Sequence, residues 1–281
     1  MLAPYLVGLA ALVFVPAAIT FWLAFHEYDL IGEPRFLGLD NFRELWTDDV
    51  FGIALRNSLL FVAIAVPLRL LAALALGLLL HARGRATGAA RAAVLLPTVV
   101  PDAAYALLWI WILNPLYGPL NLLLGAAGAP TPRWLTDPTS ARWAVIGMLL
   151  FQIGEGFLVV LAVRQSIPQQ LYEAAALESA SALQMLRRVT LPLMAPALVL
   201  LCLRDTIFSF QANFVPALLV TQGGPPPYAT TYVPLFIYRN GFEYLRYGYA
   251  SAATLVLFAV TALVLVAQWR ILRRWRQPDA V

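Results

Sequence analysis

The chain has 281 residues, of which 61% are hydrophobic and 12% are charged, and its formal net charge is +4 at pH 7. Soluble domains carry roughly 45–50% apolar and 25% charged residues, so this composition indicates an integral membrane protein. All 19 basic residues are arginine, which excludes a GxxxxGK(S/T) phosphate-binding loop and a Schiff-base lysine. The single cysteine and two separated histidines predict neither a disulfide framework nor a metal site.

Six apolar blocks are each long enough to cross a bilayer, since about 20 apolar residues form a helix that spans roughly 30 Å. They predict transmembrane helices over residues 4–25, 55–80, 88–113, 143–163, 194–221 and 249–271. The first block lacks the basic leader and cleavage site of a signal peptide, so we expect it to be retained. The predicted fold class is all-α, a six-helix integral membrane bundle with residues 1–281 in one domain.

Two segments between the predicted helices are polar enough to lie outside the membrane. Residues 26–54 contain the sequence GEPRFLGLDNF, and the stretch 27–49 has seven acids and two arginines. Residues 114–142 are rich in proline and glycine, which predicts a folded loop without long helices. No internal repeat stands out, which counts against the inverted-repeat secondary transporters.

The distribution of arginines predicts the orientation, because cytoplasmic loops are enriched in basic residues. The loops after the second and fourth predicted helices and the C-terminal tail together hold ten arginines, against seven in the opposite loops. We therefore expect both termini on the cytoplasmic side, as an even number of helices requires. The loop at residues 166–193 then faces the cytoplasm.

Five charged residues lie in or near the predicted helices, where a charge costs about 2.5–3.5 kcal/mol on insertion scales. They are Arg69, Asp102, Glu155, Arg204 and Asp205. Helix-to-helix pairing is the interpretation we favour for Arg69, with Asp102 or Glu155 as its partner. Asp102 also follows Pro97 and Pro101, so it is alternatively expected to accept hydrogen bonds from backbone groups freed at a kink. The sequence leaves open which of these charges are structural and which line a path.

The loop at residues 166–193 is unusually organised for a connection between two membrane helices. Within it, Leu171–Leu183 is predicted to form a short helix near the membrane surface, with Glu173 close to its first turn. A carboxylate there gains about 0.3–1 kcal/mol from the helix dipole, and the alanines that follow allow close approach. A simple connection does not need so much helix, so we interpret this loop as a docking element for a soluble partner.

Three motifs in this order on six apolar blocks carry a family resemblance. The loop opens with Glu173-Ala174-Ala175 and closes with Val189-Thr190-Leu191-Pro192, after the lead-in Arg164-Gln165-Ser166-Ile167-Pro168. Its flanking motifs are Phe36-Leu37-Gly38-Leu39-Asp40-Asn41-Phe42 and Thr221-Gln222-Gly223-Gly224-Pro225. On these residues the chain resembles the permease subunits of binding-protein-dependent ABC importers, in the carbohydrate branch that includes maltose, glycerol-phosphate and oligosaccharide systems.

The resemblance implies that the loop carries a coupling helix that seats in a cleft of a separate ATPase subunit. The implied coupling residues are Glu173, Ala174, Ala175, Glu178, Ser179, Leu191 and Pro192. The family's loop glycine falls at Ser179, preceded by Glu178 in place of the usual aspartate, so we expect a slightly different bend with docking preserved. The alternative is an amphipathic helix that only anchors the loop at the membrane surface.

The resemblance also implies the composition of the working complex. It consists of two membrane subunits, two ATPases and an external solute-binding protein, in the plasma (inner) membrane of a prokaryote. A related but non-identical sister permease is expected, with a homodimer left open. The chain is then a non-catalytic, multi-pass subunit that binds no cofactor, because ATP and magnesium belong to the ATPase. Its other expected partners are the sugar and the lipid membrane, and no nucleic acid is expected.

In this family, facing positions of the fourth and fifth helices tend to line the translocation path. The corresponding residues are Met148, Phe151, Gln152 and Glu155 on the fourth helix, and Thr206, Ser209, Phe210 and Asn213 on the fifth. Spacings of three and four place each set on one helical face, and the mixture of polar and aromatic groups suits a polyhydroxylated ligand. The alternative is an ordinary small-and-polar helix interface.

Two other function classes fit the sequence less well than the importer subunit. A proton- or sodium-driven secondary carrier using Glu155 and Asp205 would explain the acids within the membrane but not the organised loop. An intramembrane serine protease would need a GxS nucleophile and a histidine within the membrane, and neither histidine lies in the middle of a predicted helix. The importer subunit is therefore the leading hypothesis.

Overall fold

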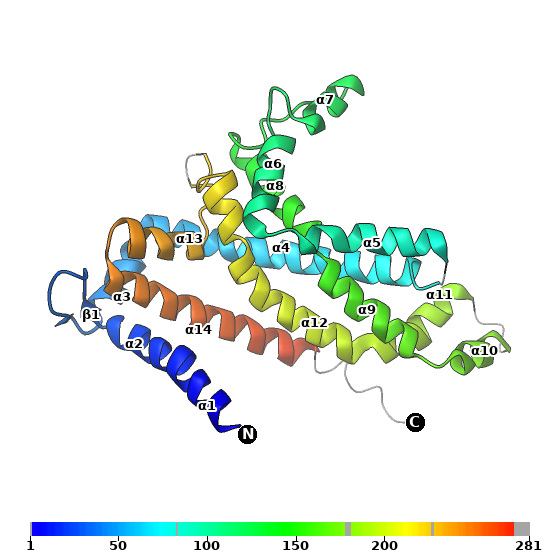
Figure 1. Ribbon diagram of the computed structural model, residues 1–281, viewed down its shortest axis with the longest axis horizontal. Helices are drawn as coiled ribbons and strands as arrows, with labels where there is room; N and C mark the ends of the chain where they lie inside the picture. The colour runs from blue at the N-terminus through cyan, green and yellow to red at the C-terminus, as the bar shows by residue number, and fades with distance from the viewer. Residues whose placement is uncertain (1, 83, 178–180, 226–227, 273–281) are drawn as a thin grey trace.

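A computed structural model describes residues 2–82, 84–177, 181–225 and 228–272. The chain is mostly helical, as predicted, and its long helices form one elongated bundle (Figure 1). The described part of the chain has four helices long and apolar enough to cross a membrane, or up to six if each of two bent helix pairs is one span. A two-residue antiparallel ribbon, β1 (His26–Glu27) with β2 (Arg35–Phe36), is the described extended structure.

The four continuous candidate spans are Ala3–Leu23, Asp49–Leu79, Ala182–Val220 and Tyr247–Leu272. The first joins α1 (Ala3–Leu9), the π-helical turn η1 (Ala10–Phe14) and α2 (Val15–Leu23), and the second and fourth are α4 and α14. The third joins α11 (Ala182–Met185), η2 (Leu186–Thr190), α12 (Leu191–Ala212) and, after a short gap, η3 (Pro216–Val220).

Two of these helices begin well before the predicted boundaries, because polar side chains cap them. The carboxylate of Asp48 accepts hydrogen bonds from the amides of Val50 and Phe51, so α4 starts at Asp49, six residues before the predicted position 55. Ser181 and Gln184 form a capping box at the start of α11, from which the helix continues into the membrane. Hydropathy marks only the apolar part of such a helix, so it misses these polar first turns.

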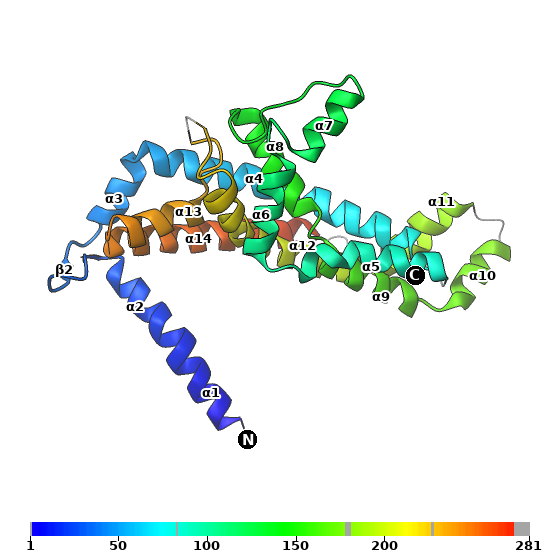
Figure 2. The ribbon, with the colours of Figure 1, turned by 45° about the horizontal axis from the view of Figure 1, so that its top comes forward.

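The third predicted helix, residues 88–113, is broken into two, contrary to prediction. It consists of α5 (Arg85–Val99) and α6 (Asp102–Ile112), which meet at 105°. Pro101 disfavours the helical conformation of the residue before it, and Val100 is extended. The helix therefore ends at Val99, and α6 turns away from the bundle together with its neighbour α8 (Figures 1 and 2).

The fourth predicted helix, residues 143–163, is also two helices. These are α8 (Pro138–Leu150) and α9 (Gly154–Ser166), bent by 44°. Gly154 lies at the start of α9, where a Cβ would overlap the side chain of Thr98 on α5. The glycine therefore lets α9 approach α5 closely at the bend.

The remaining described helices are short. They are α3 (Asp40–Thr47), α7 (Pro119–Ala126), α10 (Gln169–Leu177), α13 (Val233–Tyr238) and the π-helical turn η4 (Arg239–Glu243). The acid-rich segment around α3 is tied to α14: Arg246 pairs with Glu44 at 2.6 Å, and the hydroxyl of Tyr249 donates to Asp48. Two of its acids therefore hold the two elements together.

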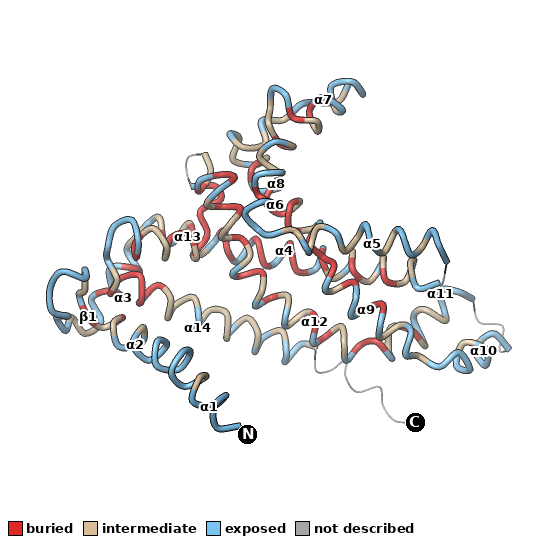
Figure 3. The backbone as a smooth tube through the Cα atoms, viewed as in Figure 1, coloured by how far each residue is buried: buried red, intermediate tan, exposed pale blue. Residues whose placement is uncertain are grey.

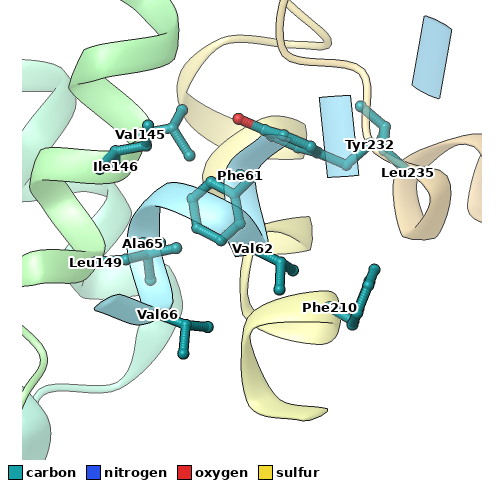
Figure 4. Close-up of a cluster of buried hydrophobic side chains, with 11 residues drawn as sticks. Phe61, Val62, Ala65, Val66, Val145, Ile146, Leu149, Phe210, Tyr232 and Leu235 are labelled. Carbon is teal, nitrogen blue, oxygen red and sulfur yellow. The ribbon is translucent and has the colours of Figure 1, made fainter. Parts of the chain in front are cut away.

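The largest apolar core joins α4, α8, α12 and the segment before α13. Its side chains include Phe61, Val62, Val145, Phe210 and Tyr232, several of which are drawn in Figure 4. By contrast, α1 and α2 are almost wholly exposed and diverge from the bundle beyond their contact with α14 (Figures 2 and 3). Much of their apolar surface is thus free in the single chain.

Candidate functional site

The four residues predicted on the fourth helix lie around the bend between α8 and α9. Met148 is fully buried and Gln152 nearly so, while the side chains of Phe151 and Glu155 are more than half exposed. The prediction that all four share one helical face is wrong, because the helix ends at Leu150 and restarts at Gly154. Phe151 instead contacts Trp109 of α6, with ring centroids 5.5 Å apart.

The four residues predicted on the fifth helix all lie on α12 or directly after it, and all are buried. Thr206 exchanges hydrogen bonds with Gln268 of α14, and Phe210 packs in the largest core. The hydroxyl of Ser209 and both side-chain polar atoms of Asn213 have no hydrogen-bond partner among the described residues. Buried polar groups are nearly always hydrogen-bonded, so these two side chains mark an unusual polar position inside the bundle.

Arg69 pairs with Asp205, and not with either partner predicted for it. The guanidinium of Arg69, 5% exposed, lies 3.3 Å from the carboxylate of Asp205 and also donates to the carbonyl of Gln152 at the helix bend. Sequence spacing could not predict this partner, because it depends on how α4 and α12 pack. Asp102 is exposed in the first turn of α6, at the break after Pro101. It lies where a kink was expected.

A second ion pair lies on the surface between α9 and α12. Arg204 donates to Glu155, and the two side chains are 47% and 60% exposed. Both line a groove with Val159, Ala197 and Leu200. The ring of Phe208 links this surface pair to the buried pair. Its centroid lies 4.8 Å from the guanidinium of Arg69 and 5.4 Å from that of Arg204. The four charges sum to zero.

The loop predicted to dock a partner forms two short helices, and not one helix that reaches Leu183. The first, α10, is described over Gln169–Leu177 and carries Glu173, Ala174 and Ala175. Glu178 and Ser179 lie outside the described residues, and the second helix is capped by Ser181. Leu191 and Pro192 are the first two residues of α12, which follows the π-helical turn η2 without a break.

Tyr172 joins α10 to both neighbouring helices, a role that the sequence pattern did not reveal. The guanidinium of Arg164, in the last turn of α9, lies 4.2 Å from the centre of the Tyr172 ring. The hydroxyl of Tyr172 is 3.0 Å from the hydroxyl of Thr190, which ends η2 just before α12. The only available signal was that Tyr172 directly precedes the Glu-Ala-Ala motif.

The Thr-Gln-Gly-Gly-Pro motif forms a tight turn with a structural role. Gly223 and Gly224 have φ of 87° and 85°, values that favour glycine, and a Cβ on either would approach a threonine hydroxyl within 3 Å. Thr231 donates to the carbonyl of Gly223, and Thr230 donates to the hydroxyl of Thr221. Among the described residues, no three His, Cys, Asp or Glu side chains are grouped to hold a metal ion.

The arrangement of bent apolar helices, charges within them and an organised loop agrees with a comparison to known proteins. Residues 70–277 match the family described as binding-protein-dependent transport system inner membrane component. The chain belongs to this family. The prediction from the loop and its flanking motifs is confirmed, and the chain is a membrane-embedded, multi-pass permease subunit.

Relatives and solved structures agree with the family over nearly the whole permease. The probable ABC transporter permease protein YesP of Bacillus subtilis is 30% identical over 278 residues, 98% of this chain and 89% of YesP. The trehalose/maltose transport system permease protein MalF of Thermococcus litoralis is 30% identical over 262 residues, 92% of this chain and 88% of MalF. A chain in the crystal structure of a bacterial alginate ABC transporter with its alginate-bound periplasmic protein has the same fold, with a TM-score of 0.85 at 24% identity, covering 99% of this chain and 94% of that one. These relatives do not favour the ion-coupled carrier.

Proposed function

We propose that this permease forms half of the translocation path of an ABC importer for a sugar or a related polyhydroxylated solute. The observation that carries the proposal is the Glu155–Arg204 ion pair, which is exposed between α9 and α12. Charged side chains within membrane helices almost always face a partner or a water-filled cavity. The face of the permease that bears this pair is therefore expected to border the path.

The predicted path residues fit this proposal at two depths. Phe151 and Glu155 are exposed and available to a solute in the single chain. Gln152, Ser209 and Asn213 are buried, and the last two hold unpartnered polar atoms. We expect these groups to gain hydrogen bonds to solute hydroxyls or water when α9 and α12 separate during transport. Met148, Thr206 and Phe210 would then support the path from within the bundle.

The charge of the path is neutral at this position, because Arg204 offsets Glu155. A lone carboxylate would disfavour an anionic solute, but the pair does not. The names of the similar proteins include both a trehalose/maltose permease and a transporter crystallised with alginate-bound protein. We therefore propose a carbohydrate of unspecified charge as the solute, with the binding protein setting most of the selectivity.

The proposed complex contains a sister permease, two ATPases and an external binding protein, in a prokaryotic inner membrane. Six spans with both termini cytoplasmic would place α10 against an ATPase and the segments 27–49 and 222–248 against the binding protein. The exposed face of α10, which includes Glu173, is available for docking. ATP and magnesium would bind to the ATPase, and this permease would bind no nucleotide.

Purification of the tagged permease from its native membrane in mild detergent tests this proposal. Mass spectrometry should identify an ATPase and a second permease that travel with it, and vesicles made from the complex should accumulate solute only with the binding protein and ATP. A homo-oligomer without an ATPase in several mild detergents, with accumulation driven by an ion gradient, would refute the proposal.

A further inference from the structure

A pocket opens between α4, α8 and the segment before α13. Its volume is about 200 Å³, and it is open on one side. None of its lining residues belongs to the predicted path or coupling loop. The Arg69–Asp205 cluster and the Glu155 groove are separate from it.

One end of this pocket, which we call the polar end, is formed by Asn57, Thr139, Arg142 and Tyr232. The Nε of Arg142 donates to the carbonyl of Ala229, and its two terminal nitrogens have no partner in the described parts of the chain. Arg142 is otherwise exposed near the first turn of α8. It therefore presents a free, positively charged fork to the pocket.

Tyr232 adds a buried donor to the polar end. Its side chain is 2% exposed, and its hydroxyl has no hydrogen bond to any described residue. Figure 4 shows this hydroxyl directed toward Val145 and Ile146 of α8. Burial raises the pKa of Tyr232, so the hydroxyl stays protonated and can donate to an anion. A tyrosine hydroxyl and a free guanidinium therefore line the same pocket, and both can donate hydrogen bonds to an acceptor bound there.

The other end of the pocket is apolar. Along both α4 and α8, the lining residues change from polar near the start of the helix to apolar further along it. On α4, Asn57 is followed by Leu60 and Ile64 one and two turns further along. On α8, Arg142 is followed by Trp143 and then Ile146. Leu60 is 44% exposed and Trp143 is 53% exposed, so the pocket opens sideways. Tryptophan is enriched where membrane helices meet the interface, so we expect the polar end at the boundary of the bilayer and the apolar end toward its centre.

We propose that this pocket binds one phospholipid, with its phosphate on Arg142 and Tyr232 and an acyl chain along Leu60, Ile64 and Ile146. An arginine fork matches the oxygens of a phosphate, and basic pockets between membrane helices bind anionic headgroups. A soluble anion would not need the apolar end, and a neutral sugar would not need the guanidinium. The order of polar and apolar groups along two helices matches the order within a lipid.

Native mass spectrometry of the purified permease complex, delipidated by detergent exchange and titrated with dioctanoyl phosphatidylglycerol, tests this site. The wild-type complex should retain one lipid that Arg142→Gln loses, with affinity reduced about tenfold because two charge-assisted hydrogen bonds are removed. Arg56→Gln is the matched control, since Arg56 is an exposed arginine on the same end of α4 that does not line the pocket. It should retain the lipid.

Two further measurements keep the proposal falsifiable if Arg142→Gln does not fold. Leu60→Gln leaves the polar end intact and should also weaken binding of the lipid. Glycerol phosphate and maltose, added as soluble competitors, should not displace it. Equal binding by the wild type, Arg142→Gln and Leu60→Gln would overturn the proposal, as would displacement of the lipid by glycerol phosphate or by maltose at comparable concentration.

Discussion

Arg69 and Asp205 form a nearly buried ion pair that joins α4 to α12, with nitrogen and oxygen 3.3 Å apart. The Nε and one terminal nitrogen of Arg69, and one oxygen of Asp205, have no further partner among the described residues. The pair lies beside a small hollow lined by Ile153, Gly156 and Leu201, with volume for about one water molecule. A bound water there would satisfy some of these atoms.

Asp205→Asn should destabilise the permease by about 3–5 kcal/mol, because it leaves the charge of Arg69 buried without an opposite charge beside it. The double variant Arg69→Met/Asp205→Leu should recover most of this loss, since an apolar pair of similar volume is often as stable as a buried ion pair. Thermal unfolding of the purified complex measures both. Equal stability of Asp205→Asn and the wild type would show that the pair does not hold the helices together.

These charges also show how far the sequence could predict the site. The positions of Arg69 and Asp205 within apolar helices were evident from hydropathy, but their pairing was not. It depends on which faces of α4 and α12 meet, and on the bend before Gly154 that brings the carbonyl of Gln152 to Arg69. Similarly, the coupling motif located α10, but the tertiary contacts of Tyr172 follow from how three helices pack.

Glu155→Gln should reduce solute transport about tenfold while changing stability by less than about 1 kcal/mol. The pair with Arg204 is half exposed, and exposed ion pairs contribute little to stability. The substitution would nevertheless leave an uncompensated positive charge on the proposed path. Transport into vesicles and thermal unfolding of the same preparation separate the two effects.

The charge-swapped variant Glu155→Arg/Arg204→Glu serves as the control for that experiment. It keeps the path neutral and should restore part of the transport lost in Glu155→Gln. If Glu155→Gln transports as well as the wild type, the pair does not border the path.

Gly154→Ala should destabilise the bend between α8 and α9 by about 1–3 kcal/mol, the usual cost of overpacking. Its Cβ would overlap the hydroxyl of Thr98, so the double variant Gly154→Ala/Thr98→Ala should recover part of the loss. Gly147→Ala is a matched control, because no atom lies within 4 Å of its Cβ position and alanine favours a helix. Thermal unfolding in detergent ranks the stabilities of Gly154→Ala, the double variant and Gly147→Ala. A Gly154→Ala variant as stable as Gly147→Ala would mean that α5 and α9 are not closely packed at the bend.

Tyr172→Phe should uncouple ATP hydrolysis from transport. The substitution removes the hydroxyl contact with Thr190 but keeps the ring beneath Arg164, so α10 remains attached to α9 while its link to α12 is lost. A typical hydrogen bond contributes about 0.5–1.5 kcal/mol, which corresponds to roughly a two- to tenfold change in an equilibrium. The solute transported per ATP hydrolysed by the reconstituted complex should fall by a similar factor, with the ATPase still bound.

Thr190→Val removes the same hydrogen bond from the other side, together with the one from the Thr190 hydroxyl to the carbonyl of Met185, and should give at least the same loss. The double variant Tyr172→Phe/Thr190→Val should then be no worse than Thr190→Val alone, because Tyr172→Phe removes no interaction that Thr190→Val has left. Tyr117→Phe, which changes an exposed tyrosine hydroxyl elsewhere in the chain, is the control and should leave the ratio unchanged. Additive losses in the double variant would show that the two hydroxyls act separately. Loss of the ATPase from the complex of Tyr172→Phe would show that Tyr172 acts in docking, and that the contact with Thr190 does not transmit motion from α10 to α12.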